Sequence, residues 1–304
     1  MMKNVEKAKA TKTKFSPLTI LLFTVLVLYA AVMLVMFFWV FITASKTYVG
    51  DYSSFEPDLY PDNIVGWPKE FVLFANIAEI NEGFAKFTLV EMAFNTIAYA
   101  VGCALAKVLV TCVVAYLCAR YDNWFSKLVY NIVIVSMIVP IVGSQAAEIQ
   151  MAKELGLYNQ IWGMWLMRSN FLGLYFLVFH SVFKSMPNGY YEAAKIDGAN
   201  DWQVMVRVAL PLVKLTFLSI FLIVFIEYWN DYLIPNLYLP DYKTLSLALY
   251  QQSQGQELKG SMTYLQQVPY VMATVLIVTI PVIVLFCVFS ERLMGNLSVG
   301  GIKG

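Results

Sequence analysis

Long stretches without a charged residue constrain this chain more than any other feature. The segments Phe15–Ser45, Leu128–Ala147 and Gly260–Ser290 contain no Asp, Glu, Lys or Arg. Each is long enough to cross a lipid bilayer, which takes roughly 20 apolar residues. The whole chain is 60% hydrophobic and only 13% charged, about half the charged share of an ordinary soluble protein. The chain is therefore predicted to be a membrane protein.

Three further segments complete a predicted set of six transmembrane helices. They are Met92–Ala119, Ser169–Phe183 and residues 212–232. Arg168 and Lys184 flank the second of them, and their long side chains can extend to the two membrane interfaces. The predicted fold class is an all-α membrane protein with six transmembrane helices.

Lysine and arginine predict the orientation of these helices. With the N-terminus inside, most of the 21 basic residues fall on the cytoplasmic side, as the positive-inside rule requires. The first apolar run is too long for a signal peptide and has no clear cleavage site, so we expect a retained helix. The predicted organisation is a basic cytoplasmic arm (1–14), a first transmembrane helix (15–45), an extracytoplasmic loop (46–91), a transmembrane core (92–290) and a cytoplasmic tail (291–304).

One polar, helix-forming segment interrupts the apolar core on the predicted cytoplasmic side. It reads Glu-Ala-Ala-Lys-Ile-Asp-Gly over residues 192–198, and Leu210-Pro211 follows it. Small alanines allow another surface to approach closely. Gly198 can end the helix with a positive φ, and Asn200 or Asp201 can cap a second helix. The segment suits docking to a soluble partner, although a solvated loop that contains a helix is the plainer alternative.

This pattern strongly resembles the EAA signature of ATP-binding-cassette (ABC) importer permeases. Met186-Pro187 and the Tyr190-Tyr191 pair before the segment, and Trp229-Asn230-Asp231-Tyr232 with Pro235 after it, resemble the carbohydrate branch, which includes the maltose permease. The resemblance implies the type I importer permease fold, with residues 186–211 forming a coupling loop and a cytoplasmic coupling helix. It implies that the ATPase is coupled through these residues: Tyr191, Glu192, Ala193, Ala194, Asp197, Gly198, Leu210 and Pro211.

The glycine-rich C-terminus fits the same resemblance. In that branch a similar tail reaches between the two ATPase subunits, which implies ATPase contact for Gly300, Gly301 and Lys303. A flexible, disordered end is the alternative interpretation.

Charged residues inside the predicted helices are the other candidates for function. Each costs on the order of 2.5–3.5 kcal/mol at a helix centre, so we expect Lys107, Glu227 and Asp231 to face the bundle interior or a translocation cavity. A structural Lys107–Glu227 ion pair is an equal alternative. Glu227 and Asp231 are expected one turn apart on one helical face. With Trp229 and Asn230 they form the candidate translocation path, where Trp229 could stack on a sugar or pack against a neighbouring helix.

Other polar segments carry weaker signals. Residues 71–87 of the long external loop predict an amphipathic helix, which could contact an external partner or cover the bundle. Trp162 and Trp165 suggest an interfacial belt. The glutamines of the last external loop (Gln251, Gln252, Gln254 and Gln256) could bind sugar hydroxyls or be an ordinary polar loop. The single histidine, His180, is expected to hydrogen-bond within the bundle, and the four cysteines are expected to be packing residues without metal or disulfide partners.

The chain has no phosphate-binding loop and no plausible catalytic cluster, so it is predicted not to be an enzyme or to bind a cofactor or metal. The resemblance implies an ATP-driven, binding-protein-dependent importer, with an oligosaccharide as the substrate. It implies a heterodimer with a second permease, two ATPase subunits that hold ATP and Mg²⁺, and an extracytoplasmic solute-binding protein. The expected location is the bacterial cell membrane, multi-pass, with both termini cytoplasmic and no nucleic acid partner. An ion-gradient-driven secondary transporter and a non-transporting scaffold subunit are the rival interpretations.

Overall fold

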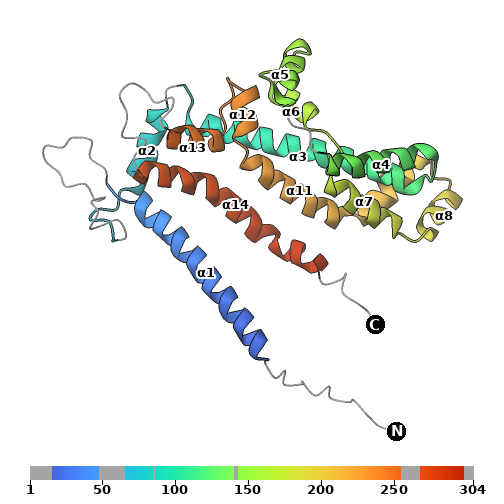
Figure 1. Cartoon of the computed structure of the whole chain (residues 1–304), viewed down its shortest axis with the longest axis horizontal. Coiled ribbons are helices and arrows are strands. Elements are labelled where there is room, and N and C mark those ends of the chain that lie inside the picture. The colour runs from blue at the N-terminus through green and yellow to red at the C-terminus, as the bar shows by residue number, and fades with distance from the viewer. Residues whose placement is uncertain (1–15, 48–65, 85, 140–142, 255–267, 298–304) are drawn as a thin grey trace, which may run out of the picture.

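The computed structural model describes residues 16–47, 66–84, 86–139, 143–254 and 268–297, and these residues form helices without a β-strand. The long helix α3 (Leu89–Arg120) runs along the molecule, with α2 (Leu73–Gly83) and α13 (Leu245–Gln254) at one end and α8 (Gly189–Ile196) at the other (Figure 1). The remaining elements are α1 (Pro17–Ala44), α4 (Trp124–Ile138), α5 (Gln145–Glu154), α6 (Ile161–Met167), α7 (Leu174–Lys184), α9 (Asp201–Val204), the π-helical turn η2 (Met205–Ala209), α10 (Leu210–Leu212), α11 (Lys214–Trp229), α12 (Leu233–Tyr238) and α14 (Val268–Leu297).

Six apolar helical segments match the six that the sequence predicts. Among the described residues α1, α3 and α14 are long and apolar enough to cross a membrane. The segment from α9 to α10 and helix α11 pass the same test together, bent by 73° at their junction. Helices α4 and α7 are apolar but shorter.

The predicted third span is wrong as a continuous helix, and the fourth is shorter than predicted. Helix α4 ends at Ile138, and Val139 is extended (φ −87°, ψ 112°) because the following residue is Pro140, which disfavours the helical conformation before it. The next helix, α5, begins at Gln145. Helix α7 has only 11 residues, or about 17 Å, so it spans roughly half of a ~30 Å hydrocarbon core.

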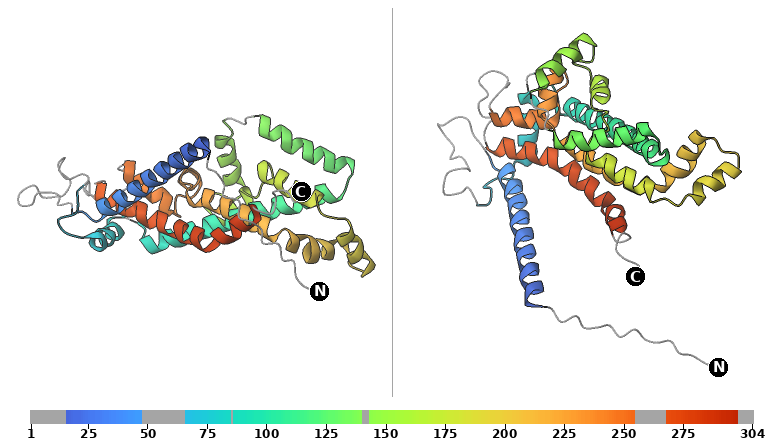
Figure 2. Two further views of the ribbon diagram at one scale, coloured as in Figure 1. Left: turned by 90° about the horizontal axis from the view of Figure 1, so that it is seen from below. Right: turned by 45° about the vertical axis from the view of Figure 1, so that its right-hand side comes forward.

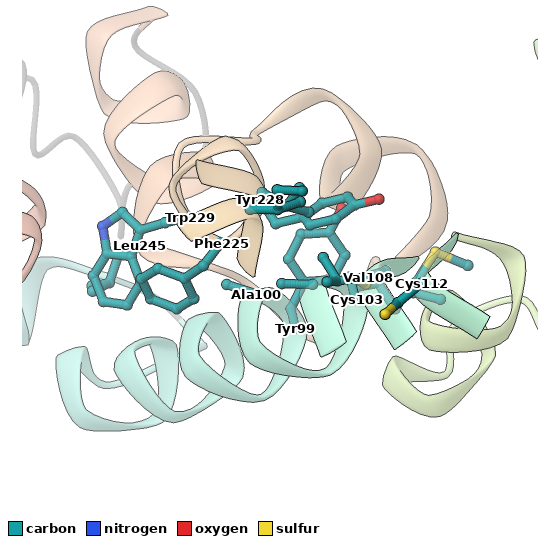
Figure 3. Packing of buried hydrophobic residues seen from close by; sticks show 14 of the residues in the cluster. Tyr99, Ala100, Cys103, Val108, Cys112, Phe225, Tyr228, Trp229 and Leu245 are labelled. Carbon is teal, nitrogen blue, oxygen red and sulfur yellow. The ribbon is translucent and has the colours of Figure 1, made fainter. Parts of the chain in front are cut away.

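Helix α3 organises the core. Thr88 and Glu91 form a capping box at its start, which satisfies two backbone N–H groups. Small buried residues such as Ala100, Cys103 and Ala104 let neighbouring helices approach closely, and α6, α7 and α11 pack on α3 (Figure 3). Cys103 and Cys112 are buried, so their predicted packing role is confirmed, whereas the side chain of Cys287 is exposed.

Helix α1 stands apart from the other helices over most of its length (Figure 2). Its apolar side chains are exposed from Leu18 to Phe38, and it is buried only at its C-terminal end, where it packs against α14. An apolar helix with exposed sides needs lipid or another apolar helix around it.

The predicted amphipathic helix in the external loop is confirmed as α2. Its buried residues Leu73, Asn76 and Ile80 follow helical spacing. Asn76 Nδ2 donates to the carbonyl oxygens of Ala44 (2.8 Å) and Lys46 (3.0 Å), which ties α2 to the end of α1.

Candidate functional site

The EAA segment forms a short helix, α8, whose two ends are set by local sequence. Gly198 adopts φ +79°, a left-handed conformation that ends the helix after Ile196 and Asp197. Asn200 then caps α9, accepting from the Gln203 N–H at 2.8 Å, while the Gln203 side chain accepts from the Asn200 N–H at 2.9 Å. The predicted glycine stop is confirmed, and of the two predicted caps, Asn200 and Asp201, the structure shows Asn200.

Tyr191 fastens α8 to the end of α3. Its side chain is only 3% exposed, and the Arg120 guanidinium carbon lies 4.2 Å from the centre of its ring. The Tyr191 hydroxyl donates to Met186 Sδ at 3.3 Å, and Arg120 Nη1 donates to Asn188 Oδ1 at 3.5 Å. Burial raises the pKa of Tyr191, and the nearby Arg120 charge opposes that rise. Tyr191 is therefore uncharged at neutral pH, and its buried ring connects α8 to the end of α3.

The other predicted coupling residues lie on the open side of α8. Glu192, Ala193, Asp197 and Gly198 are exposed, and Ala194 is partly buried. A groove of about 570 Å³ opens beside them, lined by Pro187, Gly189, Tyr190, Ala193, Ala194, Asp197 and Val208. The segment thus offers small and acidic residues around a shallow groove.

Two bulky apolar residues of this surface were missed by sequence reasoning. Ile196 is 85% exposed and Trp202 is 68% exposed. Both residues are therefore available for contact with another surface. In the sequence, their exposure was indicated only by their position inside an otherwise polar segment.

An ion pair holds α8 against α9 across the Gly198 turn. Lys195 Nζ lies 2.6 Å from Asp201 Oδ1. The hydrogen bond from Lys195 lowers the pKa of Asp201, and Tyr121 and Arg120 act in the same direction. Asp201 is therefore ionised at neutral pH, and its ion pair with Lys195 connects the two sides of the turn.

Leu210 and Pro211 mark a change of helix direction. Proline cannot donate a backbone hydrogen bond, and its ring clashes with the carbonyl four residues earlier in an α-helix. The chain avoids this clash with the wider π-turn η2, in which the Leu210 N–H reaches the Met205 carbonyl oxygen. The 73° bend before α11 follows at once, so these residues set the angle between the α8 region and the membrane helix.

The charged residues of the membrane core contact tyrosines of neighbouring helices. We call this set the polar seam: Lys107, Glu227 and Asp231 with Tyr99, Tyr175 and Tyr228. Glu227 accepts a hydrogen bond from the Tyr175 hydroxyl of α7 at 2.6 Å. Asp231 accepts from the Tyr99 hydroxyl of α3 at 2.7 Å and from the Ile234 N–H at 3.1 Å. Because α11 ends at Trp229, the expectation that both acids occupy one face of the same helix is wrong.

Lys107 lies between aromatic rings on the same seam. Its Nζ is 5.7 Å from the Tyr175 ring centre and 5.8 Å from the Tyr228 ring centre, as in a cation–π arrangement. Lys107 and Glu227, both within the described part of the chain, do not form an ion pair. The structural alternative of a direct Lys107–Glu227 ion pair is therefore wrong.

Trp229 and Asn230 bond within the protein. Trp229 is 3% exposed, its ring lies 5.6 Å from the Phe225 ring at a tilt of 41°, and its indole N–H donates to the Val278 carbonyl of α14 at 3.0 Å. The packing alternative for Trp229 is thus confirmed. Asn230 is exposed and donates to the Ile226 carbonyl at 2.9 Å, closing the end of α11. Solute contact by the proposed path residues stays a prediction.

Arg168 is a polar residue that sequence reasoning misplaced. It was expected to extend to the membrane interface, but its guanidinium carbon lies 5.6 Å from the centre of the Tyr238 ring. Within the described chain its Nε and Nη2 atoms are buried and have no hydrogen-bond partner. Its position depends on contact with Tyr238 of α12, 70 residues later in the chain, which no local pattern reveals.

Other expectations also change with the structure. Gln251 and Gln252 lie on α13 and are buried, at 7% and 1% exposure, because this segment packs as a helix and not as a loop. His180 packs against the rings of Tyr130 and Phe176, and among the described residues it makes no hydrogen bond, so the predicted bond is wrong. Trp165 donates to the Ala98 carbonyl at 3.0 Å, so it packs on α3.

Some predicted residues cannot be placed. Gly300, Gly301 and Lys303 of the tail, the basic arm and Gln256 lie outside the described residues.

Comparison with known proteins identifies the family. Residues 108–298 match the family model described as the inner membrane component of binding-protein-dependent transport systems. The diacetylchitobiose uptake permease NgcG of Streptomyces coelicolor is 26% identical over 280 residues, covering 90% of this chain and 86% of that protein. The lactose transport permease LacG of Rhizobium radiobacter is 26% identical and covers 76% of this chain and 81% of that protein.

A solved structure has the same fold. It is a bacterial ABC transporter involved in the import of the acidic polysaccharide alginate, with a TM-score of 0.72 and 19% identity, covering 90% of this chain and 95% of that chain. The importer permease fold and the role of a transport subunit agree with the residues described above. This chain belongs to the family of inner membrane components of binding-protein-dependent transport systems.

Proposed function

We propose that this chain is one of two different permease subunits in an ATP-driven importer for an oligosaccharide. The importer also holds two ATPase subunits, which carry ATP and Mg²⁺. One of them docks on the α8 surface from the cytoplasm, and a solute-binding protein delivers the sugar from outside. Both chain termini lie in the cytoplasm of a bacterial cell. The observation that carries the proposal is the α8 surface, with Glu192 and Ala193 exposed and Tyr191 buried against Arg120.

The names of the relatives support a sugar as the solute. They include permeases for diacetylchitobiose, for lactose and for melibiose, raffinose and stachyose. These solutes are short chains of sugars, so an oligosaccharide is the chemistry that they share.

In the proposed mechanism, closure of the ATPase dimer moves α8, and α8 moves α3 through Tyr191 and Arg120. Helix α3 carries Lys107 and Tyr99 of the polar seam, so the motion reaches the centre of the bundle. The two permeases then open alternately to each side. The membrane helices act as rigid bodies, because packed interfaces switch between discrete arrangements.

Uptake into vesicles that contain the full complex tests this proposal. ATP inside the vesicles should drive uptake of an oligosaccharide that the binding protein delivers, and Glu192→Ala should abolish most of it. Glu154→Ala is the matched control, because Glu154 is an exposed acid on α5, and it should leave uptake unchanged.

The rival secondary transporter makes the opposite prediction. Uptake without the ATPase subunits that follows a proton or sodium gradient would overturn the importer proposal. Equal uptake by the Glu192→Ala and wild-type complexes would remove the coupling role of α8.

A further inference from the structure

A polar cavity opens at the end of the bundle that carries α8. Its volume is about 400 Å³, within the range of small-molecule pockets, and it lies where the end of α3, the start of α4 and the end of α7 come together (Figure 1). Its polar lining includes Asp122, Lys127, Tyr130, Asn131, His180 and Lys184. The cavity shares no lining residue with the groove beside α8, so it is a separate site.

Two helix faces bring these side chains together. Lys127, Tyr130 and Asn131 are spaced three and four residues apart, so they share one face of α4. His180 and Lys184 share a face of α7 in the same way. The Tyr130 and His180 ring centres lie 4.9 Å apart, which joins the two faces across the cavity. The site therefore depends on tertiary structure and not on one local segment.

Positive charge exceeds negative charge around this cavity. Lys127 and Lys184 stand on its two walls, and Asp122 is the acid of its lining. Asp122 lies 3.2 Å from Lys127, but both side chains are 69% exposed, so the ion pair is weak and leaves donors of the ammonium group free. Lys184 forms no ion pair within the part of the chain that the structure describes. The cavity thus offers two cationic groups against one carboxylate.

Neutral groups of the lining add further hydrogen-bonding capacity. In the described ranges the side chains of Tyr130, Asn131 and His180 make no hydrogen bond to another residue. Their donors and those of the lysines point to one shared space. Ammonium groups bond most strongly to anionic oxygens, while hydroxyl and amide groups bind neutral oxygens as well. This combination fits a phosphate group that carries hydroxyls nearby.

The surroundings of the cavity favour a phosphate that belongs to a lipid. Trp124, the first residue of α4, is 76% exposed, and a tryptophan at the end of an apolar helix is typical of the membrane interface. Leu128, Ile132 and Val135 are exposed at helical spacing along the adjoining face of α4. Acyl chains would cover these apolar side chains, whereas a soluble phosphate would leave them uncovered.

We propose that the cavity between α3, α4 and α7 binds the headgroup of an anionic phospholipid of the cytoplasmic leaflet. Lys127 and Lys184 bind its phosphate, Tyr130 and Asn131 bond to the phosphate or to headgroup hydroxyls, and the acyl chains lie along the apolar face of α4. Basic pockets between membrane helices on the cytoplasmic side suit such headgroups. This inference rests on the proposed function, which places the α8 end of the bundle at the cytoplasmic face.

Protection of Cys118 from alkylation measures occupancy of this cavity. Cys118 lines it and is partly buried, whereas Cys287 is exposed on α14 and does not line it. In the delipidated importer complex in detergent, phosphatidylglycerol should halve the alkylation rate of Cys118 at a concentration about tenfold lower than phosphatidylcholine requires. The rate for Cys287, read from its own peptide by mass spectrometry, should respond equally to the two lipids.

The lysine variants test which groups hold the headgroup. Lys127→Gln and Lys184→Gln should each raise the half-protecting concentration of phosphatidylglycerol about fivefold, the effect of one lysine beside an anionic headgroup. Lys184→Arg should stay near wild type because it keeps the charge. Lys153→Gln is the control, since it removes an equal charge from an exposed position on α5 and should change nothing. The two lipids on the wild-type complex decide the proposal even where a variant does not assemble.

Equal protection of Cys118 by both lipids would overturn the proposal, and so would protection that survives in the double variant Lys127→Gln, Lys184→Gln. Protection by inorganic phosphate at the concentration that suffices for the lipid would assign the cavity to a soluble anion instead. A Cys118 that stays unreactive in the delipidated complex would show that another subunit covers the cavity, which also overturns the lipid site.

ATP-dependent uptake of an oligosaccharide, measured separately, distinguishes failure of this inference from failure of the proposed function. Uptake that persists while phosphatidylglycerol gives no selective protection would reject only the lipid site. Selective protection in a complex that takes up no sugar would count against the proposed function alone.

Discussion

Single residues determine where α8 ends. Gly198 sits at φ +79°, and a side chain in the left-handed region costs on the order of 1–2 kcal/mol. Gly189, in the first turn of the same helix, has no such angle, and a Cβ there would meet open space. The two glycines therefore provide a matched pair for testing how the α8 stop is encoded.

Gly198→Ala should loosen the end of α8, raising the amide hydrogen-exchange rates of residues 195–199 by about tenfold, which corresponds to about 1.4 kcal/mol. Gly189→Ala should leave those rates within about twofold of wild type or slow them, since alanine favours a helix. Equal exchange rates in wild type and Gly198→Ala would show that the left-handed turn does not limit α8.

Among single residues, the sequence predicts best those whose role depends on their near neighbours in the chain. Gly198 and Asn200 were predicted because a helix stop and a helix cap depend on a few neighbouring residues. Arg168 and Gln251 were misplaced because their surroundings come from distant parts of the chain. Arg168 lies against Tyr238 of α12, and Gln251 is buried on α13, which packs on α3 and α14. Charge and polarity indicate exposure only where tertiary contacts do not supply another environment.

At the scale of elements, the packing of α6 on α3 includes one especially close approach. Gly102 of α3 lies directly under Trp165, so a Cβ at position 102 would overlap the indole ring. The Trp165 indole N–H also donates to the Ala98 carbonyl at 3.0 Å. This contact fixes the segment that carries Arg168.

Gly102→Ala should therefore displace Trp165 and destabilise the protein by about 1–3 kcal/mol, the usual range for overpacking. The melting temperature of the purified complex measures it. Trp165→Ala removes the clash, so adding Gly102→Ala to that variant should cost much less than adding it to wild type. A melting temperature unchanged by Gly102→Ala alone would contradict this account of the α3–α6 contact.

A second contact joins three connections between helices, which carry Lys86, Asn159 and Asp241. Asp241 accepts from Lys86 Nζ at 2.7 Å and from Asn159 Nδ2 at 2.7 Å, and its N–H donates to Asn159 Oδ1 at 3.1 Å. Asn159 takes φ +57°, a conformation that asparagine tolerates. The hydrogen bond from Lys86 lowers the pKa of Asp241, followed in effect by that from Asn159.

This shift predicts a pH dependence with a definite sign. Because the folded-state pKa of Asp241 is depressed, its stabilisation is complete above the unfolded-state pKa, about 3.9, and is lost as the pH falls through the lower folded value. At pH 7 the melting temperature of wild type should be slightly higher than that of Asp241→Asn. The difference should be small because the groups are exposed to solvent, and it should disappear below about pH 3.9. A melting-temperature difference that stays constant from pH 7 to pH 3 would contradict the role of the ionised carboxylate.

At the scale of the whole molecule, apolar content predicted the number of membrane segments but not their shapes. All six apolar segments have helical counterparts, since burial in lipid is decided by composition over about 20 residues. The break before Pro140, the short α7 and the 73° bend before α11 were not predicted, although Pro140 and Pro211 mark two of them. Such breaks are tolerated where neighbouring helices satisfy the freed backbone groups.

The overall arrangement places α8 and the polar seam on one continuous helix. Helix α3 has 32 residues and is therefore about 48 Å long. Its C-terminal end contacts Tyr191 of α8 through Arg120, and it carries Lys107 near its middle and Tyr99 towards its N-terminal end. Tyr191 is the buried side chain of α8 that contacts Arg120, so removing its ring should separate ATP hydrolysis from transport.

The most direct measurement is the amount of oligosaccharide transported per ATP hydrolysed by vesicles that contain the full complex, comparing wild type, Tyr191→Ala and Tyr191→Phe. Tyr191→Phe keeps the ring beside Arg120 and loses only the hydroxyl contact with Met186, so its ratio should stay near that of wild type. Tyr191→Ala should still assemble and hydrolyse ATP, but its transport per ATP should fall by about tenfold, the effect of losing about 1.4 kcal/mol of coupling. A Tyr191→Ala complex that transports as much oligosaccharide per ATP as wild type would contradict the account.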